Sequence, residues 1–256
     1  MHSENVAPTV EPDRRTRKRR ARRGALLELA ADLVDERGLE GLTMAALAEA
    51  ADYAPASLYT YFPSRSALLA ALQQQALAVL GEVAADHRRR WDEALGGTAA
   101  APAPAALARL LAFSRLFLTA PQHHAREFRL QQRLLVTPDS EETADAAEVV
   151  PAAMAVLDVP RRLLAEAVDA GALTAEADGP DPIDRPLDEA VVRTLAWVVA
   201  MNGALLADEL TTGLPTTGVH LGDHLTTSLL RGWGADPADL AAAASLAADL
   251  PLPPLP

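Results

Sequence analysis

The residues whose types and spacing suggest a chemistry begin with a basic run near the N-terminus. Residues 14–23 read RRTRKRRARR, so eight of these ten side chains carry a positive charge. Such a cluster binds phosphates, although a solvated tail has the same composition. The chain has a net charge of −12, but residues 1–65 hold equal numbers of acidic and basic residues. The excess of acidic residues therefore lies in residues 66–256. This distribution favours a nucleic-acid-binding domain joined to a separate acidic domain.

No pattern of side chains points to catalysis. The sequence has no cysteine, no G-x-S-x-G motif and no glycine-rich phosphate loop. Disulfides and thiolate metal sites are thereby excluded, and we expect no enzymatic activity, no cofactor and no metal. His220 and His224 stand four residues apart, with Asp223 between them, so one helix face can present both. A third ligand is not evident, which favours a surface or interface role over a metal site.

The chain is expected to lie in the cytoplasm. Its N-terminal segment lacks the continuous apolar core of a signal peptide. The longest apolar candidate, 195–206, is shorter than the roughly 18 residues of a membrane span and contains Asn202. We therefore expect no contact with a membrane.

The elements that position these residues are expected to be helices throughout. Ala and Leu dominate, and no segment alternates with a period of two. Residues 1–17 are expected to form a disordered start of the basic arm, and residues 251–256 a Pro-rich tail. Helices are expected over about 18–37, 43–50, 55–62, 64–94, 104–119, 122–136, 139–157, 160–170, 187–211, 219–232 and 237–249.

Two short helices with a tight turn between them follow the first helix. Leu42, Leu47, Ala50 and Leu58 are spaced to bury one small core, and a turn of about four residues leaves the second short helix projecting. A projecting short helix fits a DNA major groove about 12 Å wide. Gly38 is expected to end the helix before this pair.

Residues 22–69 resemble the DNA-binding domain of TetR-family regulators. The resemblance rests on G-L-T-x-x-x-L-A at 41–48 and L-Y-x-Y-F-x-S-[KR]-x-x-L-L at 58–69. It implies an all-α protein with a three-helix helix-turn-helix DNA-binding domain over 18–66, followed by a helical ligand-binding and dimerisation domain over 67–250. The implied function is a homodimeric repressor that binds a palindromic operator and is released by a small molecule. An activator, or a ligand-binding or protein-interaction module with weak DNA binding, remains open.

The resemblance also assigns DNA-binding roles to individual residues. Thr43 caps a helix whose N-terminus can bind phosphate, and these two roles can coexist. Tyr59 would reach a base, with packing in the core as the alternative, whereas Phe62 is assigned to the core. Where the family often has Gly in the turn, Asp52 tolerates a left-handed conformation. The predicted DNA-binding residues are Arg19, Arg20, Arg22, Thr43, Pro55, Ala56, Ser57, Tyr59, Thr60, Tyr61 and Arg65.

The second domain resembles a class of TetR C-terminal domains with the signature W-x-x-x-x-H-G, with Asn202 in place of His. The family implies dimerisation through helices over about 187–211 and 219–232, and the alternative is packing within one chain. Sparse aromatic and polar residues suggest a pocket for a lipophilic effector, with ordinary core packing as the alternative. The candidate pocket residues are Phe113, Phe117, His124, Phe128, Gln131, Met154, Trp197, Met201 and Asn202.

Overall fold

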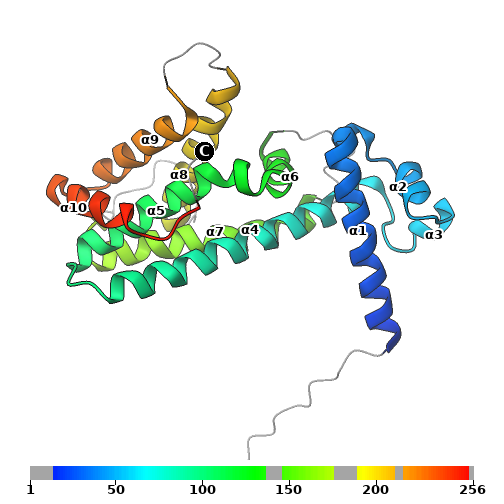
Figure 1. Ribbon diagram of the computed structural model, residues 1–256, viewed down its shortest axis with the longest axis horizontal. Coiled ribbons are helices and arrows are strands. Elements are labelled where there is room, and N and C mark those ends of the chain that lie inside the picture. The colour runs from blue at the N-terminus through cyan, green and yellow to red at the C-terminus, as the bar shows by residue number, and fades with distance from the viewer. Residues whose placement is uncertain (1–13, 137–145, 176–188, 211–215, 254–256) are drawn as a thin grey trace, which may run out of the picture. The chain divides into compact units, whose positions relative to one another are not determined.

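The computed structural model describes residues 14–136, 146–175, 189–210 and 216–253 of the chain. These residues form α-helices and no strand, as Figure 1 shows. The chain divides into two compact units, the first covering Met1–Leu72 and Pro138–Ala147 and the second covering Gln73–Thr137 and Glu148–Pro256. The helices are α1 (Arg14–Gly41), α2 (Met44–Ala50), α3 (Pro55–Leu58), α4 (Arg65–Gly96), α5 (Pro102–His123), α6 (Ala125–Val136), α7 (Ala146–Asp169), α8 (Glu189–Leu210), α9 (Gly218–Gly232) and α10 (Pro237–Ala248).

The first unit consists of α1, α2, α3 and the first turns of α4. Buried leucines at helical spacing, including Leu26, Leu27 and Leu33, place one face of α1 in the core of this unit. Gly38 has a φ of 70°, which interrupts the helix where the sequence predicts its end. The helix begins at Arg14, four residues before the expected start, so part of the basic run expected to be disordered is helical.

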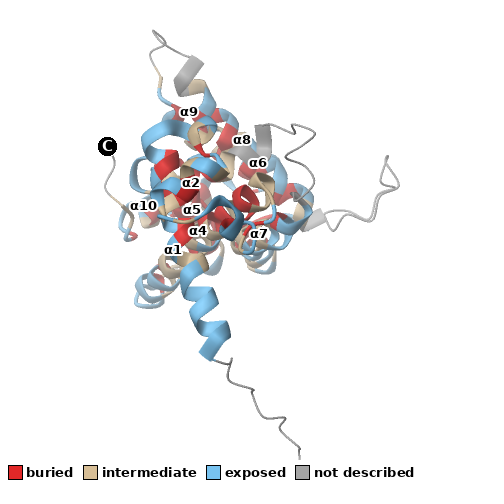
Figure 2. Ribbon diagram, turned by 90° about the vertical axis from the view of Figure 1, so that its right-hand side faces the viewer, coloured by how far each residue is buried: buried red, intermediate tan, exposed pale blue. Residues whose placement is uncertain are grey.

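The second unit is built around α5. This helix packs against α6, α8, α9 and α10, and Figure 2 shows buried residues along it. Trp91 of α4 and Trp197 of α8 are fully buried in the same core. The Trp91 indole N–H donates to the backbone oxygen of Pro251 at 3.0 Å, which fastens the start of the C-terminal tail. Residues 254–256 of the predicted Pro-rich tail lie outside the described residues.

The prediction of two helices over 139–157 and 160–170 was wrong. The structure has one continuous helix, α7, with Pro151 and Pro160 inside it. A proline within a helix removes one backbone hydrogen bond and favours a break. Pro160 is buried, however, so the packing of its ring offsets the lost bond. Residues 139–145 of the predicted helix lie outside the described residues.

Other helix ends also differ from the prediction. The helix expected over 104–119 is α5, which extends from Pro102 to His123 and contains Pro121. The expected helix over 55–62 is shorter, because α3 ends at Leu58 and a tight turn follows. In that turn the amide of Tyr61 donates to Leu58 O at 2.8 Å, and the amide of Phe62 donates to the same oxygen at 2.9 Å.

Two of the described helices are long and apolar enough to cross a membrane. The apolar windows of α4 and α5 are 44% and 61% buried inside the protein, respectively. Helices in the core of a soluble protein have the same length and composition. The burial therefore fits core helices, although the sequence prediction did not single out either segment.

A close approach of α5 and α9 depends on Gly222. A Cβ at this position would lie 2.5 Å from Cδ2 of Leu118, a fully buried side chain of α5. We expect Gly222→Ala to destabilise the second unit by about 1 kcal/mol, because overpacking of about 1–3 kcal/mol exceeds the better helix propensity of Ala. Chemical denaturation monitored by circular dichroism measures this change.

Gly81→Ala provides the matched control for the Gly222 prediction. A Cβ at Gly81, also inside a helix of the second unit, would lie 3.5 Å from Val156, an ordinary contact. This substitution should therefore stabilise the protein by up to about 1 kcal/mol. Equal stabilisation by both substitutions would contradict the tight packing of α9 on α5.

Candidate nucleic-acid interface and ligand cavity

The exposed face of α3 is the first candidate site. Leu58 and Phe62 are buried and fix α3 and the following turn against the core of the first unit. Pro55, Ala56 and Ser57 are exposed. A recognition helix needs buried residues that hold it to the domain and an exposed face that can enter the groove.

Tyr59 projects from the end of this helix. Its side chain is 52% exposed, so the alternative of core packing for Tyr59 is wrong, whereas the core assignment of Phe62 is confirmed. Thr60 is exposed, and its hydroxyl donates to the backbone oxygen of Ser57 at 2.7 Å. Tyr61 is half-buried. The aromatic ring of Tyr59 is therefore available to a ligand outside the protein.

The turn between α2 and α3 has the predicted geometry. Asp52 has a φ of 55°, the left-handed conformation expected where the family often has Gly. The amide of Tyr53 donates to Ala48 O at 2.9 Å, which closes the turn on α2. The angle between the two short helices thus depends on one left-handed residue.

Thr43 caps α2. Its hydroxyl oxygen accepts a hydrogen bond from the amide of Ala46 at 3.0 Å, and the residue is exposed. This bond satisfies one of the amides that have no partner within the helix, while the other amides of the first turn stay available to a phosphate. The structure thus contains the capping role, and the phosphate contact stays a prediction.

Thr43→Ala is expected to destabilise the first unit by about 1 kcal/mol, the usual effect of losing such a cap. Thr43→Ser is the control, since serine keeps the capping oxygen and should change stability little. Thermal unfolding of both variants measures the difference. An alanine variant as stable as the serine variant would contradict the capping role.

Arg65 lies at the start of α4, and its side chain is directed at the connection between α1 and α2. Its Nε donates to the backbone oxygen of Leu42 at 2.7 Å, and Nη2 donates to that of Leu39 at 2.9 Å. These bonds hold the connection between α1 and α2 to α4. The predicted phosphate-binding residue therefore also has a scaffold role, which sequence reasoning missed because its acceptors are backbone groups.

The N-terminal turns of α1 form a basic helix, defined here as residues 14–22. All of these residues are exposed, as the pale blue N-terminal turns of α1 in Figure 2 show. Arg19 Nη2 donates to the backbone oxygen of Thr60 at 2.9 Å, which ties the basic helix to the end of the recognition segment. Arg20 and Arg22 are exposed beside it. The positive charges are thus carried by a helix bonded to the α3 region.

A cavity of about 160 Å³ lies within the second unit. Residues of α4, α5, α6, α7 and α8 line it, and almost all of them are apolar. Five predicted pocket residues lie around it: Phe113, Phe117, His124, Phe128 and Gln131. The rings of Phe117 and Phe128 meet edge to face with centroids 5.8 Å apart. The ligand-binding role of these five residues stays a prediction.

The four other predicted pocket residues lie elsewhere. Trp197 and Met201 are fully buried in the core behind the cavity, and Asn202 is buried with Nδ2 donating to Val198 O at 2.9 Å. Met154 is 47% exposed and lines a neighbouring surface hollow with Pro151 and Arg161. None of the four is among the residues that line the cavity.

Trp197 instead takes part in a buried hydrogen-bond network. Its indole N–H donates to Thr226 Oγ1 at 3.0 Å, and Ser114 Oγ lies 2.8 Å from the same hydroxyl oxygen. The ring of Trp197 also packs on Phe113, with centroids 5.3 Å apart. Sequence reasoning missed Ser114 and Thr226, because single hydroxyl residues in apolar helices carry no pattern. The network joins α5, α8 and α9 behind one wall of the cavity.

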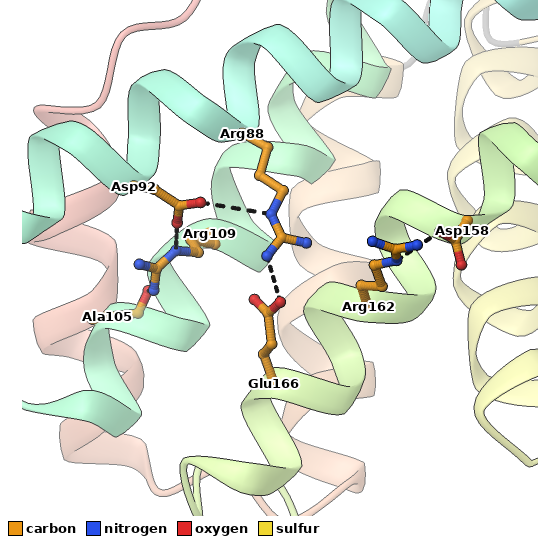
Figure 3. A network of polar contacts seen from close by, with 7 residues as sticks. All are labelled: Arg88, Asp92, Ala105, Arg109, Asp158, Arg162 and Glu166. Carbon is orange, nitrogen blue, oxygen red and sulfur yellow. Dashed lines mark hydrogen bonds and ion pairs between the residues drawn. The ribbon is translucent and has the colours of Figure 1, made fainter. Parts of the chain in front are cut away.

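Ion pairs join α4 to α5 and α7 beyond the cavity. Figure 3 shows Arg88 of α4 pointing at Glu166 of α7, with which it forms an ion pair. Arg88 Nε also lies 3.6 Å from Asp92 Oδ2, and Asp92 Oδ1 accepts from Arg109 Nε of α5 at 2.7 Å. Linked charges of alternating sign fix this part of α4 more firmly than one surface pair does.

One face of α8 is apolar and exposed. Val192, Leu195, Val199 and Leu206 are between 38% and 57% exposed and recur at intervals of three to seven residues. These four residues are called the α8 stripe here, and two of them, Leu195 and Val199, also line the cavity. An exposed apolar stripe of this kind marks an interaction surface.

The two histidines of α9 lie on its outer side. His220 and His224 are both exposed. Between them, burial raises the pKa of Asp223, and Arg115 and His220 oppose that rise. The described residues include no group of three His, Cys, Asp or Glu side chains that could hold a metal ion. The arrangement favours the surface role that the sequence suggested for the histidine pair.

Comparison with known proteins finds a family that one segment of the chain resembles. Residues 26–72 match the family model of the bacterial regulatory proteins of the tetR family, and this range covers the buried face of α1, both short helices and the start of α4. Residues 26–72 are thus similar to the DNA-binding segment of the tetR family. No curated protein matches the sequence. Three predictions are thereby confirmed: the resemblance to the TetR family, the all-α fold class and the DNA-binding helix-turn-helix.

Solved structures with the same fold match most of the chain. RolR in complex with the ligand resorcinol is 22% identical, with a TM-score of 0.55, and the match covers 93% of this chain and 98% of RolR. FadR from Bacillus subtilis in complex with stearoyl-CoA is 15% identical, with a TM-score of 0.51, covering 81% and 97%. SmeT, the repressor of the Stenotrophomonas maltophilia multidrug efflux pump SmeDEF, is 16% identical, with a TM-score of 0.53, covering 85% and 92%. The W-x-x-x-x-H-G resemblance stays a prediction.

Proposed function

We propose that the protein is a homodimeric transcriptional repressor that binds a pseudo-palindromic operator and leaves it when a small molecule occupies the cavity. The observation that carries the proposal is the exposed α3 face, with Tyr59 at its end and the basic helix bonded beside it. A helix-turn-helix of the TetR type provides a helix that fits the major groove, and the arginines of α1 provide the positive charge that binds phosphates.

Individual residues have distinct tasks in this proposal. Tyr59 and Ser57 contact bases, with Pro55 and Ala56 packing against the groove. Thr43, Thr60 and Tyr61 contact phosphates at its edges. Arg19, Arg20 and Arg22 follow the DNA backbone next to the groove. Arg65 contributes indirectly, because two of its nitrogens hold the carbonyl oxygens of Leu39 and Leu42.

The α8 stripe is the proposed dimer contact, together with the exposed side of α9. Burying apolar surface stabilises an interface by about 25 cal/mol per Å². The stripe presents four large apolar side chains that are between 38% and 57% exposed. A two-fold axis through α8 and α9 would pair each stripe with its copy and would place two readers on one operator.

Ligand release would act through α4. Leu77, Leu80 and Val83 of α4 line the cavity, and the same helix begins at Arg65 in the first unit. A ligand can shift the protein only by binding one arrangement of α4 more tightly than another. The RolR and FadR structures with bound ligands support a small-molecule effector for a chain of this fold.

A second candidate is a ligand-binding or protein-interaction module that binds DNA only weakly. The observation that favours it is the composition of α3, where Pro55, Ala56 and Leu58 offer few hydrogen bonds to bases. Activation of transcription rather than repression is compatible with the same DNA-binding domain. Under either alternative we propose a cytoplasmic protein that has no enzymatic activity and no cofactor.

Binding to the gene's own upstream region tests the proposed function. The full-length protein, shown to be dimeric by light scattering, is titrated into that DNA and into unrelated DNA of equal length. We expect specific binding about 10³-fold or more tighter than non-specific binding at physiological salt. Equal affinity for both DNAs would overturn the repressor and favour the weak-binding module.

A further inference from the structure

The size of the cavity limits its ligand. Its volume of about 160 Å³ is close to that of an apolar protein cavity of about 150 Å³ known to hold benzene. Such a space encloses one six-membered ring with small substituents.

The walls of the cavity favour a flat aromatic ring. Phe113, Phe117 and Phe128 all line it, and the latter two present an edge and a face to each other. A third ring gains from such surroundings when its centroid lies about 4.5–7 Å from those of its neighbours. Trp197 supports Phe113 from behind, so this wall keeps its position.

Two side chains give the cavity a polar part. His124 follows the last turn of α5 and Gln131 belongs to α6, and both line the cavity. Within the described residues neither side chain has a hydrogen-bond partner in the protein. A ligand hydroxyl can therefore bond to either side chain without breaking a hydrogen bond within the protein.

The lining also argues against a charged ligand. Among the described residues that line it there is no Asp, Glu, Lys or Arg. Burying a carboxylate or an ammonium without a counter-ion costs several kcal/mol or more. Carboxylic acids, acyl-CoA esters and cationic drugs are therefore disfavoured in this cavity.

We infer that the cavity binds a neutral single-ring phenol, with the ring among Phe113, Phe117 and Phe128 and one or two hydroxyl groups at His124 and Gln131. This inference rests on the proposed function only in treating the cavity as the effector site. The ring supplies the apolar contacts, and each hydroxyl can both donate and accept a hydrogen bond.

Isothermal titration of the full-length protein without DNA tests the inference, with phenol as the probe. We expect saturable binding of one phenol per chain, and at least tenfold weaker binding of benzoate, which has a similar ring but a negative charge. Decanoic acid should not bind measurably. No phenol binding at millimolar concentration, or equal binding of benzoate, would overturn the inference.

Substitutions locate the bound phenol. Phe117→Trp fills the cavity and should abolish phenol binding. If circular dichroism shows that this variant does not fold, Val156→Phe fills the cavity from α7 instead and should have the same effect. The double variant His124→Ala, Gln131→Leu should weaken phenol about tenfold, the value of one or two hydrogen bonds, and leave toluene unchanged. Phenol binding that survives both cavity-filling variants would place it elsewhere and overturn the inference.

The same variants separate this inference from the proposed function. Phenol that binds in the cavity without changing DNA affinity would support the ligand class and overturn ligand release. A protein that binds its operator but no phenol would overturn the ligand class and leave the DNA-binding proposal standing.

Discussion

Replacing Arg15, Arg17, Arg20 and Arg22 with glutamine should lower affinity for duplex DNA by at least about tenfold and flatten its dependence on salt. Each phosphate contact contributes about 0.9 to the slope of log K against log salt, so losing two contacts per protomer lowers the slope of a dimer by about 3.6. Glutamine is a good helix former, and these positions are exposed, so the helix should persist. Arg19 stays in place because it bonds to Thr60.

Fluorescence anisotropy with labelled DNA at several salt concentrations measures both quantities. The control is Arg89→Gln with Arg90→Gln, two exposed arginines of the second unit that are 67% and 56% exposed. This control removes charge without touching the basic helix and should leave the slope unchanged. A quadruple variant with the affinity and slope of the parent would contradict the role of the basic helix in binding phosphates.

Tyr59→Ala should weaken binding to the operator by about 1–3 kcal/mol, the effect of losing a base contact, while leaving the melting temperature unchanged. The reason is its position, because a side chain that is 52% exposed contributes little to the core. Tyr59→Phe keeps the ring and should retain most of the affinity if the ring packs on a thymine methyl group.

Competition with unrelated DNA separates the base contact from a general loss of binding. Non-specific binding comes from phosphate contacts, so Tyr59→Ala should lower specific binding and leave non-specific binding as it was. A large fall in the melting temperature, or unchanged specific binding, would contradict the assignment of Tyr59 to the interface.

The first unit was predictable from sequence because local rules govern it. Thr43 as a cap, Gly38 as a helix end and Asp52 in a left-handed turn each follow from the chemistry of one residue type. The buried Phe62 follows from the resemblance to the TetR family. These features were predicted and are present, because each is determined within a few residues of the chain.

The second unit was less predictable because distant contacts govern it. Proline rules predicted a break near Pro160, but the burial of this ring within a continuous α7 overrides them. The cavity walls from α4 and α7 consist of Leu, Val and Ala, which look like any core residue in a sequence. Trp197 was assigned to the cavity by its rarity, whereas its hydrogen bond to Thr226 places it behind the wall.

Arg19 and Arg65 show a related limit. Both were predicted from sequence as phosphate ligands, and in the structure both donate to backbone oxygens of the first unit. A sequence shows which side chains carry charge, but the carbonyl groups that compete for them become visible only in the fold. Charge patterns therefore predict a DNA-binding surface better than they predict the task of each arginine in it.

Selection of bound sequences from a random duplex library by the full-length protein tests the central claim most directly. A dimer that carries two α3 helices should enrich an inverted repeat, with half-site centres one helical turn of about 10–10.5 base pairs apart or a multiple of it. The Tyr59→Ala variant should enrich the same repeat less strongly. Recovery of sequences without any repeated half-site would contradict a homodimeric TetR-family reader.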